Sequence, residues 1–155
     1  MGLIVQKFGG SSVADADRIR NVARIINETY RRGHRVVAVL SAQGDTTDDL
    51  IAKAAEINPN ASKREMDMLL STGEQISCSL CAMAIEAMGY PVVSLTGWQA
   101  GFRTNSSYGD ARVKRIDTEP VLAELDLKKA AKAAGVKSVA MSHVADINNV
   151  TGYIR

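Results

Sequence analysis

The fold is decided near the start of the chain, where residues 3–12 read LIVQKFGGSS. The first six of these residues are a β-prone apolar run, and the glycines and serines end it. Apolar residues then recur at helical spacing from Ile19 to Tyr30, and Arg31-Arg32-Gly33 is a typical helix end. Residues 36–40, VVAVL, are typical of a strand that is covered on both faces. Strand, helix and strand in this order predict a βαβ unit and therefore a parallel sheet.

Capping residues predict where two helices begin. Ser12, three residues before Asp15, indicates the start of the first helix, and Thr46 or Thr47 that of a helix ending near Ile57. The further elements are predicted, in chain order, as helices over 64–70 and 76–88 on either side of a Ser71-Thr72-Gly73 interruption, a strand over 91–95, a long surface loop over 96–110, a strand over 111–116, a helix over 119–125, a helix over 128–134, a strand over 136–141 and a turn over 146–149.

Composition excludes several classes of protein. The chain has 155 residues, of which 46% are hydrophobic and 23% charged, and these ordinary values argue against disorder and against a disulfide-stapled mini-protein. A net charge of +2 is too balanced to indicate nucleic acid or an acidic membrane as the partner. No stretch approaches the ~18 consecutive apolar residues of a membrane span, and the start lacks the pattern of a signal peptide. We therefore expect a soluble cytoplasmic protein.

The two cysteines form a single CxxC, Cys78-Ser79-Leu80-Cys81, within an apolar helical pattern. A redox or metal site is one interpretation, but there is no second CxxC, and His34 and His143 lack ligand spacing. Small thiols in such a helix are more often core residues. We expect both cysteines to be buried, reduced and without metal.

Two loops carry residues suited to binding an anion. Gly9 and Gly10 follow Lys7 at the end of the first predicted strand, and glycine amides before a helix, together with a lysine, suit phosphate. The second loop is Ser41-Ala42-Gln43-Gly44-Asp45-Thr46-Thr47-Asp48-Asp49, which follows the neighbouring strand at the same edge of the sheet. The alternatives are a plain glycine turn in the first loop, and an N-cap with first-turn acids in the second.

Glu74 is the third candidate, because it follows the Ser71-Thr72-Gly73 interruption. A carboxylate at such a break can receive a substrate ammonium group. The alternative is a solvated first-turn glutamate, since charged side chains are mostly exposed.

Taken together, these segments resemble the amino-terminal part of bacterial aspartate kinases, in the amino acid kinase superfamily. The resemblance covers residues 1 to about 126. It is carried by KFGGSSVA (7–14), RIRNVA (18–23), SA (41–42), GDTTD (44–48), REMDMLLSTGE (64–74) and LTGWQAG (95–101).

The resemblance implies an α/β fold, a three-layer αβα sandwich with a mainly parallel sheet. It also implies the reaction of ATP with L-aspartate to give 4-phospho-L-aspartate and ADP, in the lysine, threonine and methionine branch of amino-acid biosynthesis. Mg²⁺ would arrive with the nucleotide, no protein-bound metal is expected, and a homo-oligomer is a further expectation. Lys7 would be catalytic and would contact the nucleotide phosphates together with Phe8, Gly9, Gly10 and Ser41, while Asp45, Thr46, Thr47, Asp48, Asp49 and Glu74 would line the aspartate pocket.

Residues 127–155 depart from the family pattern, which would continue with a Gly-Arg-Gly-Gly-Ser-Asp type motif and a Thr-Asp-Val-Asp-Gly type stretch. We expect two parts: residues 1–126 as the amino-terminal part of an amino acid kinase-like domain, and residues 127–155 as a βα-type tail packed on it. The absent motifs leave a fragment, a truncated homologue or a chimera open. They also leave open a non-catalytic module that binds an amino acid, an anion or another chain, and an engineered chain without a native function.

Overall fold

A computed structural model describes residues 2–125 and 139–143 of the chain. The predicted helix over 128–134 and turn over 146–149 lie outside the described residues. The elements are, in chain order, β1 (Leu3–Phe8), the 3₁₀ turn η1 (Gly10–Val13), α1 (Ala16–Arg31), β2 (Arg35–Leu40), α2 (Thr46–Ile57), α3 (Lys63–Ala87), β3 (Val92–Leu95), β4 (Phe102–Thr104), β5 (Val113–Ile116) and β6 (Val139–His143). Residues 119–125 are also helical.

The predicted parallel sheet is confirmed. β1 pairs with β2 in parallel, from Leu3 opposite Arg35 to Phe8 opposite Leu40. The full strand order is β1-β2-β6-β3, and every pairing in this sheet is parallel. The strand predicted over 136–141 is present as β6, which separates β2 from β3. All four strands therefore end at one edge of the sheet.

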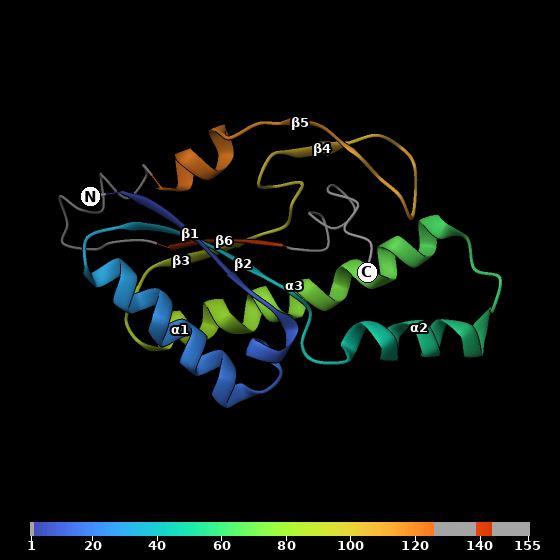
Figure 1. Ribbon diagram of the computed structural model, residues 1–155, viewed down its shortest axis with the longest axis horizontal. Coiled ribbons are helices and arrows are strands. Elements are labelled where there is room, and N and C mark those ends of the chain that lie inside the picture. The colour runs from blue at the N-terminus through green and yellow to red at the C-terminus, as the bar shows by residue number, and fades with distance from the viewer. Residues whose placement is uncertain (1, 126–138, 144–155) are drawn as a thin grey trace.

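The core lies between this sheet and a layer formed by α1 and α3 (Figure 1). β2 alternates in burial, and Val36, Ala38 and Leu40 are its fully buried residues. Against them pack the predicted apolar stripe of α1 and, from α3, Cys78, Cys81 and Ile85. The expected burial of both cysteines is confirmed.

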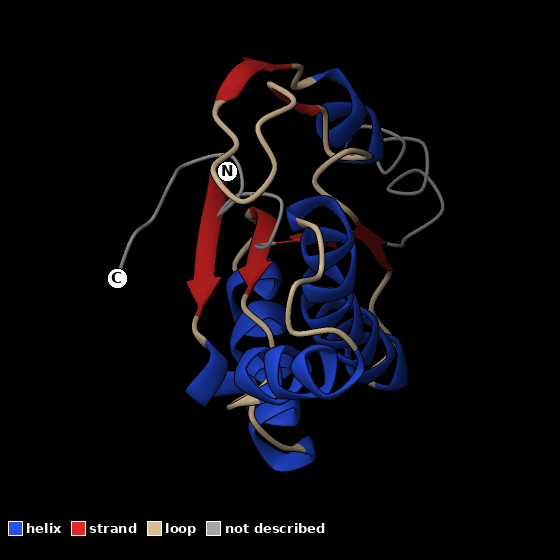
Figure 2. Ribbon diagram, turned by 90° about the vertical axis from the view of Figure 1, so that its right-hand side faces the viewer, coloured by secondary structure: helices blue, strands red, loops and turns tan. Residues whose placement is uncertain are grey.

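A short helix covers the other face of the sheet. Figures 1 and 2 show the helix of residues 119–125 on the side of the sheet opposite α1 and α3, next to the small β4–β5 sheet. Leu125, in this helix, is buried. The helices lie on both faces, and the predicted three-layer α/β fold class is confirmed.

The predicted break between two helices in the middle of the chain is wrong. The Ser71-Thr72-Gly73 interruption does not exist, because α3 runs unbroken from Lys63 to Ala87. The hydroxyls of Ser71 and Thr72 donate to the carbonyl oxygens of Met68 and Leu69, so they stay within the helix instead of ending it.

The region predicted as a loop over 96–110 contains a strand. β4 pairs in antiparallel fashion with β5, which lies within the strand predicted over 111–116. Gly101 permits the entry to this hairpin, since its φ is +88° and a Cβ there would lie 1.9 Å from the Asp117 carbonyl oxygen.

The first helix also begins differently from the prediction. Ser12 lies in the 3₁₀ turn, and Asp15 is the N-cap of α1, where its side chain accepts from the Arg18 amide at 2.9 Å. An aspartate competes well for this role, because its carboxylate also interacts favourably with the helix dipole.

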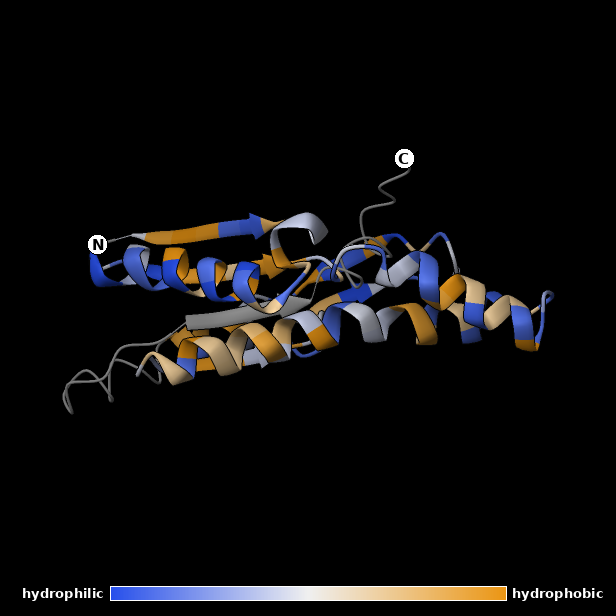
Figure 3. Ribbon diagram, turned by 90° about the horizontal axis from the view of Figure 1, so that it is seen from below, coloured by the Kyte–Doolittle hydropathy of each residue, from blue (hydrophilic) through white to orange (hydrophobic). Residues whose placement is uncertain are grey.

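α3 is long and apolar enough, by length and composition alone, to cross a membrane, and it is the one such helix within residues 2–125 and 139–143. Hydrophobic residues are spread along it (Figure 3). It packs against α1, β3 and β6. A single helix that passes this test is weak evidence for a membrane span.

We predict that stability falls at alkaline pH because of Cys81. Burial raises the pKa of this thiol from 9.0 to about 12. The unfolded chain then loses this proton near pH 9 while the folded chain keeps it, so the free energy of unfolding decreases as pH rises from 9 towards 12. Urea unfolding at pH 8 and 10 measures this, and Cys81 should account for about 1 kcal/mol of the decrease. Cys81→Ala should show a flatter pH dependence, and an unchanged slope would contradict the prediction.

We predict that a chain ending at Asp126 loses cooperative unfolding. Such a chain lacks β6, and β3 then has no partner in the sheet. Thermal unfolding followed by circular dichroism should show a broad transition in place of a sharp one. A chain ending at His143 keeps β6 and serves as the control. If both shortened chains unfold as sharply as the whole protein, β6 is not needed for the sheet.

Candidate functional site

The candidate site begins where β1 and β2 end side by side. The Ser41 amide donates to the Phe8 carbonyl at 3.1 Å, and the Gly44 amide donates to the Gly10 carbonyl at 3.2 Å. A side-chain bond reinforces the contact, since Gln43 Nε2 donates to the Val13 carbonyl at 2.9 Å. The two loops that the sequence marks for anion binding are therefore held together at one edge of the sheet.

Gly10 is required by this contact. A Cβ at Gly10 would lie 2.7 Å from the carbonyl oxygen of Ala42, closer than real Cβ atoms come to a backbone atom. Gly9 differs, because its φ is −77° and the nearest atom to a Cβ there would be Lys7 Nζ at 3.7 Å. The first glycine leaves room beside the lysine, and the second lets the two loops touch.

Glu74 enters the same place from α3. Its side chain is buried, and Oε1 accepts from the Ala42 amide at 3.2 Å. The preceding residue allows this approach, because a Cβ at Gly73 would lie 3.0 Å from Ala42 Cβ. The interpretation of Glu74 as a solvated first-turn residue is wrong, since α3 is continuous and turns this carboxylate towards the loop after β2.

The residues from Asp45 to Asp49 form the start of α2. Asp45 occupies the N-cap position, in place of the predicted Thr46 or Thr47, and its side chain makes no capping bond. The Thr46 amide donates to the Gln43 carbonyl at 2.9 Å, and Thr46 is half-buried beside Gly73. Thr47, Asp48 and Asp49 are exposed. Of the five, Thr46 is the half-buried residue, and its side chain lies next to Gly73 of α3.

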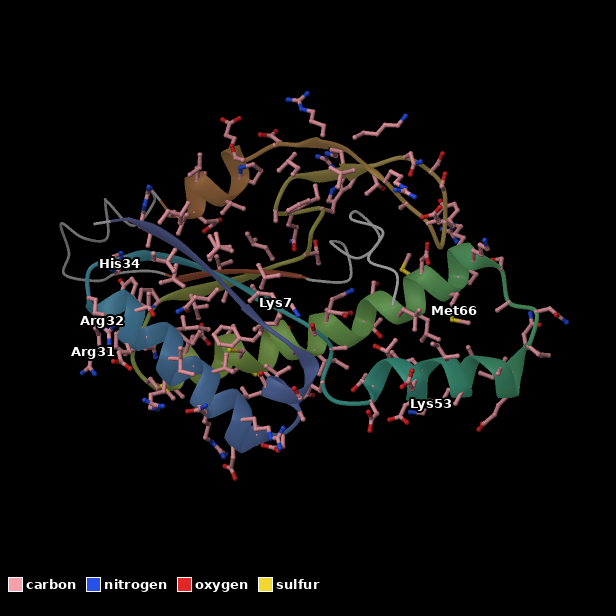
Figure 4. All side chains as sticks on the ribbon, viewed as in Figure 1. Lys7, Arg31, Arg32, His34, Lys53 and Met66 are labelled. Atoms are coloured by element: carbon pink, nitrogen blue, oxygen red, sulfur yellow. The ribbon has the colours of Figure 1, made fainter. Side chains whose placement is uncertain are left out.

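Lys7 is exposed at the carboxyl end of β1, as labelled in Figure 4. Phe8 and Ser41, at the ends of β1 and β2, are half-buried. Lys7 Nζ lies over the glycine turn, 3.7 Å from the point where a Cβ of Gly9 would be. A positive charge thus stands beside backbone amides at the strand end, an arrangement that suits a phosphate.

Ala42 and Gln43 connect these parts, and sequence reasoning gave neither a role. Ala42 touches Gly10 through its carbonyl, Glu74 through its amide and Gly73 through its side chain. The small side chain of Ala42 could have indicated this role in the sequence. A small residue between a strand and a polar loop lets other segments approach the backbone closely from several sides.

Metal-binding groups are scarce in the part of the chain that the structure describes. No group of three or more His, Cys, Asp or Glu side chains in residues 2–125 and 139–143 is arranged to hold a metal ion. The carboxylates near the site do not form such a cluster. Glu74 accepts a hydrogen bond from a backbone amide, and Asp48 and Asp49 are exposed in the first turn of α2.

Comparison with known proteins gives the family. The sequence profile of the amino acid kinase family matches residues 2–142. The chain belongs to the amino acid kinase family. This match continues past residue 126 and reaches residue 142, within β6, the strand that joins β2 to β3 in the sheet.

Within the amino acid kinase family, the chain is similar to aspartokinases. It is 49% identical to the aspartokinase of Bacillus sp. (strain MGA3) over 139 residues and 50% identical to that of Geobacillus stearothermophilus over the same length. These matches cover 90% of this chain and 34% of each relative. The chain therefore spans about a third of the length of these curated relatives.

Solved structures agree with the family assignment. The aspartate kinase from Synechocystis superposes with a TM-score of 0.71 at 41% identity, covering 91% of this chain and 21% of that one. Aspartokinase III from E. coli, in complex with aspartate and ADP, superposes with a TM-score of 0.63 over 90% of this chain and 40% of its own. At 20% identity the second match supports the fold alone.

We predict that alanine is tolerated at Gly9 and not at Gly10. Gly10→Ala places a Cβ against the Ala42 carbonyl and should lower the free energy of unfolding by about 1–3 kcal/mol. Gly9→Ala should change it by less than about 0.5 kcal/mol, because its backbone is extended and there is room for the Cβ. Urea unfolding of both variants is the measurement. Equal losses would show that the contact with Ala42 does not constrain the loop.

Proposed function

We propose that this chain is the substrate-binding part of an aspartate kinase, which transfers a phosphoryl group from ATP to the side-chain carboxylate of L-aspartate. The observation that supports this proposal is the meeting of three segments at Ala42: the glycine loop after β1, the loop after β2 and Glu74 of α3. Similarity to aspartokinases at about half identity supports the same reaction.

On the phosphate side, Lys7 supplies the positive charge and the Gly9–Gly10 turn supplies backbone amides. Phosphoryl transfer places negative charge on the oxygens of the moving group, and fixed donors lower the energy of that charge. Lys7 is thus the residue that we propose as catalytic, with Phe8 and Ser41 completing the strand ends beside it. The missing side chain of Gly9 leaves space for a phosphate next to Lys7 Nζ.

On the aspartate side, Glu74 and the start of α2 would hold the amino acid. A carboxylate has acceptor sites on both oxygens, so Glu74 can bind the Ala42 amide and also receive a substrate ammonium group. Thr46 and Thr47 supply hydroxyls, and the backbone amides at the start of α2 attract the negative charge of a carboxylate. Asp45, Asp48 and Asp49 border this region and would favour an ammonium group over a second anion.

In the proposed reaction, a side-chain carboxylate oxygen of aspartate attacks the γ-phosphorus of ATP. A new O–P bond forms, the bond from the γ-phosphorus to the β-γ bridging oxygen breaks, and ADP leaves with that oxygen. Mg²⁺ would be carried by the nucleotide. The product, 4-phospho-L-aspartate, would enter amino-acid biosynthesis in the cytoplasm, and a homo-oligomer would be the working form.

A second candidate function is a binding module without turnover. The chain spans about a third of the length of its curated relatives, and the sheet edge brings the glycine loop and Glu74 together as a binding site would require. Such a module would bind phosphate or aspartate and release no product.

One assay separates the two functions. The whole chain is incubated with ATP, Mg²⁺ and L-aspartate, ADP release is followed by a coupled assay, and the acyl phosphate is trapped with hydroxylamine. Hydroxamate formation that depends on aspartate supports the kinase. Binding of ATP or aspartate by calorimetry without hydroxamate supports the module, and the absence of both contradicts the proposed site.

We predict that Lys7→Ala weakens binding of ATP, ADP or inorganic phosphate by on the order of 1–3 kcal/mol, the range for a charge-assisted hydrogen bond. Binding should also weaken with added salt, because the lysine is exposed. Lys53→Ala is the matched control, since Lys53 is an exposed lysine on α2 (Figure 4). Calorimetric titration of the three proteins is the measurement. Equal affinity in the original protein and in Lys7→Ala would remove Lys7 from the site.

A further inference from the structure

A cavity lies between the β4–β5 hairpin and the first half of α3. Its volume is about 420 Å³, enough for a small organic molecule. α3 contributes Arg64, Asp67 and Ser71 to its lining, and the hairpin region contributes Trp98, Arg103 and Tyr108. None of the residues assigned above to phosphate or aspartate lines it. The cavity is therefore separate from the candidate site. Its lining residue on α3 nearest to Glu74 is Ser71, about one helical turn away.

The two walls of this cavity are joined by specific contacts. The Gly109 amide donates to Oδ2 of Asp67, the acidic residue of the cavity lining, at 2.8 Å. Arg64 is hydrogen-bonded to Glu65 and to Tyr108, and these bonds raise the pKa of its guanidinium. The hairpin is thus attached to α3 at its turn, and the negative charge of Asp67 is already partnered.

Arg103 contributes a buried nitrogen to the lining that has no acceptor among residues 2–125 and 139–143. Its guanidinium carbon lies 3.5 Å from the centre of the Trp98 ring, a cation–π contact that holds the guanidinium against the ring. Its Nη1 is buried and has no hydrogen-bond partner among the described residues. The register also sets Arg103 opposite Arg115, and like charges in this position destabilise a hairpin. An oxyanion beside Arg103 would satisfy the buried N–H group and neutralise this repulsion.

The rest of the lining favours a ring. The chain has only seven aromatic residues (one Trp, four Tyr and two Phe), and three of them, Trp98, Phe102 and Tyr108, line this one cavity. Trp98 is 68% exposed and Tyr108 is 49% exposed, so both rings remain accessible. Exposed aromatic faces next to a cation suit a planar apolar group that carries a negative charge.

We propose that this cavity binds a small anion in which a carboxylate or a phosphate is attached to a planar ring. Arg103 pairs with the oxyanion, and the rings of Trp98 and Tyr108 contact the planar group. This binding requires neither ATP nor aspartate, so it stands or falls separately from the kinase reaction.

Trp98 makes the proposal directly measurable, because it is the single tryptophan of the chain. Its fluorescence is titrated with benzoate, phenyl phosphate, inorganic phosphate, L-aspartate and benzyl alcohol. We expect saturable changes with benzoate or phenyl phosphate, with a dissociation constant on the order of 1 mM for ligands of this size. The two ring-free anions and the uncharged alcohol should bind at least about tenfold more weakly. The tighter of the two ring-bearing anions shows whether the site prefers a carboxylate or a phosphate.

Variants locate the binding. Arg103→Gln should weaken the tighter ring-bearing anion by about tenfold or more, and Arg103→Lys, which keeps the charge and loses the planar fork, should weaken it less. Lys114→Gln is the matched control, because it removes one positive charge from an exposed neighbour on the same hairpin. It should change affinity by less than about twofold. Circular dichroism melting shows whether each variant is folded.

Three results would overturn the proposal. The first is the absence of saturable binding by either ring-bearing anion. The second is equal affinity for benzoate and benzyl alcohol, which would leave Arg103 without a role. The third is an equal effect of Arg103→Gln and Lys114→Gln in folded proteins, which would show only a general effect of charge. Lys7→Ala should bind the ring-bearing anion as the original protein does, which separates this site from the phosphate loop.

Discussion

The backbone of Ala42 is the contact on which the candidate site depends. Its carbonyl oxygen occupies the space where Gly10 has no side chain, and its amide donates to the buried carboxylate of Glu74. The two loops at the sheet edge and the middle of α3 are thereby fixed relative to one another without any side chain of Ala42 beyond a methyl group. A buried amide without an acceptor, or a buried carboxylate without a donor, is unfavourable, so each partner stabilises the position of the other.

Local patterns in the sequence were enough for the first half of the sheet. β1, α1 and β2 each combine a clear periodicity with a clear end, and the parallel register follows because the connecting helix requires a crossover. The glycine loop and Ser41 were placed at one edge by the same reasoning. The resemblance to a known family added the expected role of Glu74, which local chemistry left open.

Tertiary contacts account for what the sequence left undecided. Gly73 has the composition of a helix break, yet its missing side chain lets an unbroken α3 approach Ala42. β4 has three residues, too few for alternation to be visible, and it forms because β5 pairs with it. Asp15 and Asp45 take N-cap positions next to residues with similar capping preference, and only the path of the chain decides between them.

The strand order has a consequence for how the protein is made. β2 and β3 belong to one sheet but are joined only through β6, the last described strand in the chain. A ribosome delivers β1, α1 and β2 early, and these can pair at once, whereas β3 must wait in a nascent chain until residues 139–143 have emerged. Sheets whose pairing spans long sequence separations form slowly, because loop closure precedes the contacts that reward it. During that interval the edge of β2 that later pairs with β6 is unpaired, so the incomplete chain offers a strand edge to which another chain can add.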